Sequence, residues 1–122
     1  MTGENSCHVI VWEFRIRPEK EKEFVEKYGP DGMWARFFQG SRGYIRTELV
    51  RDVTDTLRFL TLDYWRSHED FESFRKEHQQ AYEKFSGLIA SEGWIEREVL
   101  LGSFYKDESD FDEGTGLVPT TS

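Results

Sequence analysis

Four segments of the chain are predicted to be β-strands, and in the first of them apolar and polar positions alternate with the period of two that is typical of strands. The segments cover residues 8–17, 44–51, 57–65 and 94–105. Segment 8–17 has one strongly apolar face and one mixed face. Segment 57–65 carries aliphatic and aromatic residues on both faces, interrupted by Thr61 and Asp63. A strand that is apolar on both sides is predicted to lie centrally in a sheet, with both faces covered.

Two other segments repeat their apolar residues every three or four positions, as amphipathic helices do. The first begins at Pro18, buries Phe24, Val25 and Tyr28 on one stripe, and ends at Gly29. A short helical piece around residues 33–38 follows, and Asp31 is expected to cap its N-terminus.

The second helix is predicted to begin after Ser67, whose hydroxyl caps the N-terminus together with Asp70 in a capping-box pattern. It is expected to continue as far as Glu92, with a bend or interruption at residues 86–87. Its apolar stripe consists of Phe71, Phe74, His78, Tyr82 and Phe85. This helix must cover one face of the strand at 57–65.

The order strand, helix, strand, strand, helix, strand predicts an α+β protein with a ferredoxin-like β-α-β-β-α-β fold. Right-handed crossovers place both helices on one face of a four-stranded antiparallel sheet, with strand order 4-1-3-2. The opposite face keeps apolar residues among charged ones, so it is not expected to face water in a monomer. We therefore predict a homodimer that packs sheet on sheet through the helix-free face.

The length of 122 residues fits one domain, which we place at residues 8–105. Residues 1–7 are mostly polar and are predicted to be flexible. Residues 106–122 form an acidic C-terminal tail with five carboxylates and one lysine, which accounts for about half of the net charge of −8. We expect this tail to contribute little to the core.

The net charge of −8 argues against binding to nucleic acid or to an anionic membrane through bulk charge. No apolar run is long enough for a membrane span, and the N-terminal residues lack the pattern of a secretion signal. Cys7 is a single cysteine, which allows no internal disulfide and fits a reducing compartment. These features predict a cytoplasmic protein.

Four stretches of the sequence together resemble a known family. They are FRIRP at 14–18, GYIRTEL at 43–49, FLTLDYW at 59–65, and SHEDF at 67–71 followed by Phe74 and His78. Over about residues 8–105 the chain resembles the antibiotic biosynthesis monooxygenase (ABM) domain, a branch of the dimeric α/β-barrel superfamily. The resemblance implies a dimeric α/β barrel, with each ligand pocket between a sheet and its helices.

The same resemblance implies a range of functions. Proteins similar to this one include oxygenases that act on phenols and quinols without a cofactor, haem-degrading proteins and many proteins of no known activity. In the haem-degrading relatives an Asn on the first strand, a Trp ending the third strand and a His on the next helix form the site. Here Trp65 matches the Trp, but Trp12 stands in place of the Asn and Arg75 near the position of the His. Haem binding and degradation is therefore the less favoured interpretation.

We expect a monooxygenase that needs no metal or flavin and acts on an aromatic or polycyclic small molecule of phenol or quinol type. Such a reaction needs a group that accepts the phenolic proton, a donor that stabilises the anion, and a pocket that excludes water. His78 on the helix stripe and Trp65 at the end of its strand are the catalytic candidates. The alternative for His78 is a partly buried residue bonded to a backbone carbonyl, and for Trp65 it is packing beneath the helix.

The candidate substrate-binding residues are aromatic, with one arginine. They are Trp12, Trp34, Phe38, Phe74, Tyr44 and Arg46. Simple core filling is the alternative for the aromatic side chains. Tyr44 and Arg46 are expected to share one face of their strand with Glu48, where they bind a substrate anion or belong to the dimer interface.

Metal binding is not predicted, because His8, His68 and His78 lack the spacing of a helical ligand pair. No glycine-rich phosphate loop follows a strand, and we expect no cofactor. The alternative function is a non-catalytic dimeric domain that binds an apolar ligand or serves in assembly. A cavity of roughly several hundred Å³ that His78 reaches favours ligand chemistry. A cavity filled by the aromatic candidates favours a structural role.

Overall fold

The computed structural model describes residues 6–107 of the chain. Within this range the chain forms a four-stranded antiparallel sheet with the order β2-β3-β1-β4. The strands are β1 (Ser6–Ile16), β2 (Tyr44–Arg51), β3 (Arg58–Trp65) and β4 (Ile95–Asp107). This order confirms the sequence prediction, including the central place of β3 between β2 and β1.

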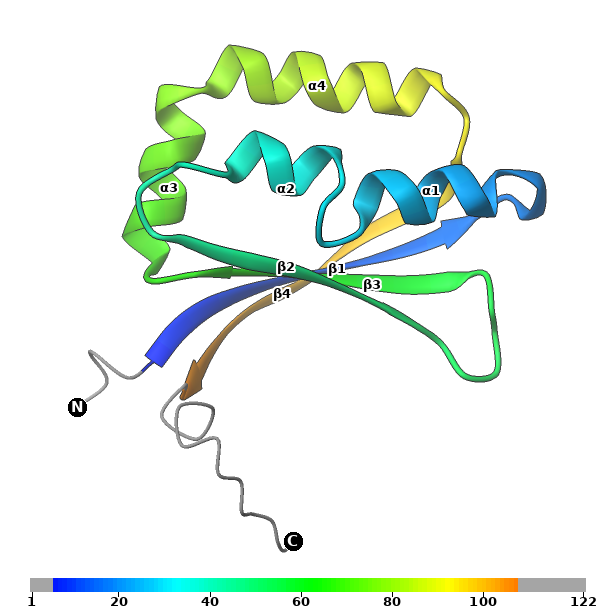
Figure 1. Ribbon diagram of the computed structural model, residues 1–122, viewed down its shortest axis with the longest axis horizontal. Helices are drawn as coiled ribbons and strands as arrows, with labels where there is room; N and C mark the ends of the chain where they lie inside the picture. Colours follow the sequence, from blue (N-terminus) through cyan, green and yellow to red (C-terminus); the bar gives the residue numbers. More distant parts are fainter. Residues whose placement is uncertain (1–5, 108–122) are drawn as a thin grey trace, which may run out of the picture.

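All the helices of the described range lie on one face of the sheet, as Figure 1 shows. After β1 come the short 3-10 helix η1 (Pro18–Lys20), α1 (Glu21–Tyr28) and α2 (Met33–Phe38). After β3 come α3 (His68–Glu77) and α4 (Gln79–Ser91). The ferredoxin-like α+β architecture is therefore confirmed, with each predicted crossover built from more than one helical piece.

The helix predicted after Ser67 is interrupted at a different position from the one expected. Ser67 does cap α3, because its hydroxyl accepts a hydrogen bond from Asp70 N at 3.0 Å. However, α3 ends at Glu77, and the chain turns at His78 before α4 begins. Nδ1 of His78 lies 3.0 Å from the carbonyl oxygen of Phe74. The same oxygen also accepts a hydrogen bond from the backbone N–H of His78. The expected interruption at residues 86–87 is absent, since both residues lie inside α4.

The expected cap of the short helix α2 is also wrong. The capping residue is Gly32 and not Asp31. A Cβ atom at position 32 would lie 2.2 Å from the carbonyl oxygen of Lys27. The chain therefore returns so closely to the end of α1 that only glycine fits there.

The sheet extends beyond the predicted domain limits of 8 and 105. Ser6 pairs with Asp107 and Cys7 with Lys106, so these residues belong to β1 and β4 and not to flexible ends. The remainder of the predicted N-terminal segment and acidic tail, residues 1–5 and 108–122, lies outside the described residues.

The covered face of the sheet holds two neighbouring aromatic clusters in the described range. One surrounds Phe14, Phe24 and Phe59, and the other surrounds Trp65, Phe38 and Phe74. The helix-free face carries a smaller apolar cluster. Its members are Cys7, Val9, Val11 and Tyr64, with Leu60 and Leu62 packed against them. β3 is thus apolar on both sides, as its sequence predicts.

Candidate functional site

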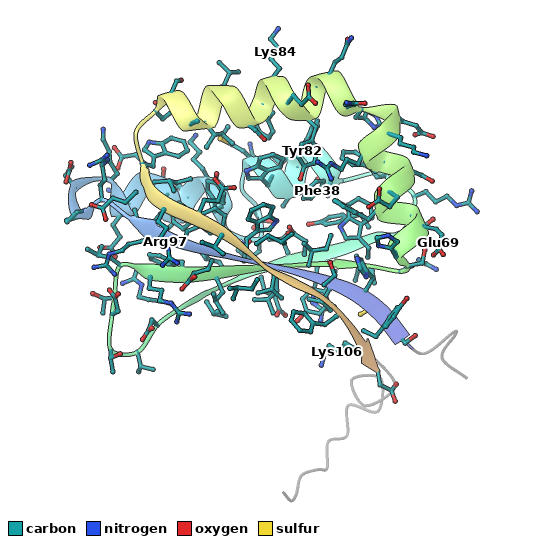
Figure 2. All side chains as sticks on the ribbon, turned by 180° about the vertical axis from the view of Figure 1, so that it is seen from behind. Phe38, Glu69, Tyr82, Lys84, Arg97 and Lys106 are labelled. Carbon is teal, nitrogen blue, oxygen red and sulfur yellow. The ribbon has the colours of Figure 1, made fainter. Side chains whose placement is uncertain are left out.

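A cavity of about 90 Å³ opens between the sheet and the helices. Every strand and three of the helices contribute side chains to it. The lining residues are Trp12, Phe14, Tyr28, Trp34, Phe38, Thr47, Thr61, Asp63, Tyr82, Ser86 and Glu98. Phe38 and Tyr82 can be followed in Figure 2, where both lie between α4 and the sheet.

The strand register brings the polar lining residues together. Residues that pair across antiparallel strands point to the same face of the sheet. Asp63 on β3 pairs with Thr47 on β2, and Thr61 pairs with Trp12 on β1. On the other side of β1, Phe14 pairs with Glu98. These pairs all face the helices and so reach the cavity.

A chain of hydrogen bonds holds the carboxyl group of Asp63. The Thr47 hydroxyl donates to Asp63 Oδ1 at 2.7 Å, and the Tyr44 hydroxyl lies 2.7 Å from the same Thr47 oxygen. Because Thr47 has one hydroxyl proton and gives it to Asp63, Tyr44 is the donor in the second bond. The chain therefore runs from Tyr44 through Thr47 to Asp63.

Burial changes the acidity of the groups around the cavity. It raises the pKa of Asp63 to about 6, although the hydrogen bond from Thr47 acts in the opposite direction. Glu98 keeps part of its surface exposed, and partial burial raises the pKa of its carboxyl group as well. Burial also raises the pKa of Tyr28 and Tyr82, so both phenols are neutral hydrogen-bonding groups near pH 7.

The predicted aromatic side chains Trp12, Trp34 and Phe38 line the cavity without filling it. The Trp34 ring lies 5.2 Å from that of Tyr82 and 5.8 Å from that of Phe38, between ring centroids. The cavity is smaller than the several hundred Å³ expected for ligand chemistry, and His78 does not line it.

His78 lies elsewhere than its stripe position predicts. Its side chain is exposed, and its ring stacks on Phe74 with 4.5 Å between centroids. It lines a separate outer hollow together with Glu77 and Asp70. The expected position beneath the helix is wrong because α3 ends one residue earlier. A catalytic role for His78 stays a prediction.

Trp65 and Phe74 are buried side by side outside the cavity. Trp65 is fully enclosed, and its ring lies 5.6 Å from that of Phe74 and 5.4 Å from that of Phe38. Its indole Nε1 has no hydrogen-bond partner among residues 6–107. The position of Trp65 fits the alternative of packing beneath α3, and that of Phe74 fits core filling.

The prediction that Tyr44 and Arg46 share a face is wrong. Tyr44 pairs with Trp65 and Arg46 pairs with Tyr64, which leaves Ile45 as the extra residue of a β-bulge. Tyr44 consequently points toward the helices and reaches the cavity through Thr47. Arg46 lies on the helix-free face, 3.2 Å from Glu48 and stacked over the Tyr64 ring at 3.9 Å.

The polar residues of the cavity were not among the predicted site residues; they are Tyr28, Thr47, Thr61, Asp63, Tyr82, Ser86 and Glu98. For Asp63 the sequence does hold a signal, because a carboxylate interrupts the covered face of a central strand. For Glu98 we find no such signal. Its orientation depends on the register of β4, which shifts between its pairs with Val11 and Trp12.

Within residues 6–107, no three His, Cys, Asp or Glu side chains come together in a way that holds a metal ion. His8 and His68 approach each other, with 3.5 Å between Nε2 and Nδ1. None of the helices in this range combines the length and hydrophobicity of a membrane span.

Comparison with solved structures supports the fold. The chain is similar to a candidate antibiotic biosynthesis monooxygenase from Bordetella bronchiseptica, with 18% identity, 85% of this chain and 97% of the other covered, and a TM-score of 0.57. A conserved protein from Methanosarcina mazei Go1 gives 12% identity, coverages of 86% and 95%, and a TM-score of 0.60. A further candidate monooxygenase, from Nitrosomonas europaea, gives 15% identity, coverages of 99% and 100%, and a TM-score of 0.55.

At these identities the likeness shows the fold alone. The comparison with curated proteins found no match. A family model described as antibiotic biosynthesis monooxygenase matches residues 8–85, which is more than half of the chain. The chain therefore belongs to the antibiotic biosynthesis monooxygenase family.

Proposed function

We propose that this protein is a monooxygenase that uses O₂ directly to oxidise a phenol in the cavity between the sheet and the helices. The observation that carries the proposal is the buried carboxyl group of Asp63, which opens into an aromatic-walled cavity and is held by Thr47. Neither a metal nor a flavin has a role in the reaction as we propose it.

Asp63 acts as the general base. With a pKa of about 6 it is mostly ionised at pH 7, yet it is more basic than an exposed aspartate. The bond from Thr47 occupies Oδ1 and fixes the plane of the carboxylate. After it accepts the phenolic proton, the neutral acid donates a hydrogen bond to the phenolate oxygen and so stabilises that anion.

The rest of the reaction is supplied by O₂ and the substrate. The phenolate transfers one electron to O₂, and the resulting radical pair combines to form a C–O bond at the ring carbon para to the hydroxyl. Asp63 returns its proton to the resulting peroxide anion, and the hydroperoxide then loses the para C–H proton together with hydroxide as water, which leaves a para-quinone. One phenol and one O₂ thus give one quinone and one water. The ring carbon is oxidised and both oxygen atoms are reduced.

The size of the cavity restricts the substrate. Engineered cavities of about 150 Å³ hold a benzene molecule, whereas this cavity measures about 90 Å³. A single phenol ring therefore fits after small side-chain movements, and a polycyclic substrate requires a wider opening. Single-ring phenols are the substrates that we propose.

We further propose that the active form is a homodimer, as members of this family typically are. The support is the apolar cluster of the helix-free face, including Val9, Val11 and Tyr64, which continues toward the exposed side chain of Phe104 on β4. A sheet-on-sheet contact covers this surface.

The test is oxygen consumption by the purified protein with 3-ethylphenol, whose para carbon is free, and detection of the quinone by mass spectrometry. Asp63→Asn is expected to lower turnover by a factor of about 10²–10⁴. Asp31→Asn serves as the control, because Asp31 is an exposed carboxylate outside the cavity and should leave turnover unchanged. Oxygen uptake that persists in Asp63→Asn would remove Asp63 as the base. Binding of the phenol without oxygen uptake would favour the non-catalytic ligand-binding domain.

A further inference from the structure

The charged groups of the cavity are of one sign. Among the described residues that line it, two are acidic, Asp63 and Glu98, and none is Lys, Arg or His. Arg75 does contact Tyr82, with its guanidinium carbon 5.5 Å from the ring centroid. However, Arg75 lines a different, outer hollow together with Glu72 and Glu83. The cavity itself therefore offers no positive side chain to a bound anion.

The two carboxyl groups mark opposite ends of the cavity. Asp63 pairs with Ile10 of β1, and Glu98 pairs with Phe14, four residues further along the same strand and on its other side. Four residues of strand span about 13 Å. Asp63 is buried, whereas Glu98 and Ser86 are the exposed members among the described lining residues. Asp63 therefore lies at the closed end and Glu98 at the mouth.

The walls between these ends are aromatic. Tyr28, Trp34 and Tyr82 approach from the helices, and Trp12 and Phe14 from β1. The faces of aromatic rings attract cations, most strongly when water is excluded. An acidic residue beside several aromatic faces is thus suited to a positively charged group and unfavourable for a negative one.

We propose that the preferred ligand of this cavity is a phenol that carries a protonated amine on a short side chain. The phenolic hydroxyl lies at Asp63, the ring lies between the aromatic walls, and the ammonium group pairs with Glu98 at the mouth. This inference names the substrate class of the proposed oxygenase and rests on that function for the catalytic role. The amine extends toward solvent, so the small enclosed volume needs to hold only the ring.

The experiment compares three phenols that share one ring and a two-carbon side chain, which ends in a positive group, in no charged group or in a negative group. These are 3-hydroxyphenethylamine (positive), 3-ethylphenol (neutral) and 3-(3-hydroxyphenyl)propionate (negative). Their binding to the full chain is measured by isothermal titration calorimetry at pH 7 without oxygen, so that turnover does not contribute. We expect the amine to bind at least about tenfold more tightly than the neutral phenol, and the propionate to bind most weakly.

Glu98→Gln is expected to abolish the preference for the amine and to leave the binding of 3-ethylphenol unchanged. Glu96→Gln is the matched control, because Glu96 is a neighbouring exposed carboxylate on β4 that does not line the cavity and pairs with Arg15 at 3.7 Å. Glu96→Gln should keep the preference for the amine. The wild-type comparison of the three ligands remains decisive even where a variant fails to fold.

The possible outcomes separate this inference from the proposed function. Equal binding of the three phenols, a preference for the propionate, or no binding of any of them would overturn the inference. Oxygen uptake with 3-ethylphenol together with no preference for the amine would leave the oxygenase function standing and refute its substrate class. A preference for the amine that Glu98→Gln abolishes, without oxygen uptake, would support the ligand class and refute the oxygenase.

Discussion

Asp63 is an ionisable residue, and the fold disfavours its charged form because its carboxyl group is buried. The pKa of about 6 in the folded chain exceeds the value of about 3.9 of an unfolded aspartate. The folded state therefore holds this proton more tightly, and the stability that the proton contributes is lost as pH rises through 6. The stability of Asp63→Asn relative to that of the wild type should thus rise between pH 4 and pH 7, by up to about 3 kcal/mol.

Urea denaturation of the wild type and Asp63→Asn at pH 4 and pH 7, at one fixed protein concentration, measures this difference in stability. Asp52→Asn provides a control. Hydrogen bonds from the backbone N–H groups of Asp55 and Thr54, and from Arg58, lower the pKa of Asp52. The stability that charged Asp52 contributes is present above the unfolded pKa of about 3.9 and is lost only as pH falls below that value, so Asp52→Asn should change little relative to the wild type between pH 4 and pH 7. Parallel stability profiles for the wild type and Asp63→Asn would show that Asp63 is not enclosed as described.

A separate prediction at the residue scale concerns His78. Its ring contacts Phe74 and bonds to the Phe74 carbonyl, away from the cavity. His78→Ala should therefore cost about 0.5–1.5 kcal/mol of stability and change the turnover of a phenol less than threefold or so. Steady-state oxygen uptake and urea denaturation are the measurements. A loss of turnover by a factor of about 10² or more would instead show that His78 is a catalytic residue.

At the scale of an element, the entry to β2 decides where Tyr44 points. Gly43 has φ +87°, and a Cβ atom there would lie 2.2 Å from Oδ2 of Asp70. Gly40 has the same φ of +87°, but a Cβ atom there would meet nothing within 4 Å. Gly40→Ala should cost about 1–2 kcal/mol for the left-handed backbone alone.

Gly43→Ala should lower the stability by about 1 kcal/mol or more beyond the loss in Gly40→Ala, because the side chain of Asp70 on α3 must also move. Thermal unfolding of the two variants gives the comparison. We expect Gly43→Ala to weaken phenol binding as well, since the displaced Tyr44 no longer supports Thr47 and Asp63. Equal stability losses in the two variants would show that Asp70 yields without cost.

At the scale of the whole molecule, the helix-free face of the sheet is expected to pair with a second copy of the chain. Phe104 is 53% exposed and lies opposite Val9, next to the apolar cluster of that face. Phe104→Glu places a charge in the proposed interface and should shift the protein from dimer toward monomer. Leu88→Glu is the control, because Leu88 is 58% exposed on α4, on the helical side of the molecule.

Light scattering at micromolar concentration measures the molecular mass of the three proteins. The melting temperature of the wild type should rise with protein concentration, and that of Phe104→Glu should depend on it less. A monomeric wild type at micromolar concentration would contradict the dimer.

The topology could be predicted from the sequence because it follows from local patterns of residues. The apolar residues on both faces of β3 indicate a central strand, and the five-residue link before Leu57 requires an antiparallel hairpin, since so short a link cannot cross over. Ser67 can be identified as a cap from its neighbours alone. Each of these inferences depends on residues adjacent in sequence, where propensity and period decide the outcome.

The arrangement of the site could be determined only from the tertiary structure. Trp12, Trp34 and Phe38 could be named from the sequence, but the extra residue Ile45 separates Tyr44 from Arg46, and the register shift in β4 sets the direction of Glu98. One extra residue in a strand reverses every side chain beyond it, and the period of the sequence does not reveal where this happens. The raised pKa of Asp63 likewise arises only when helices far away in the sequence close over it, because burial, and not residue type, sets the cost of its charge.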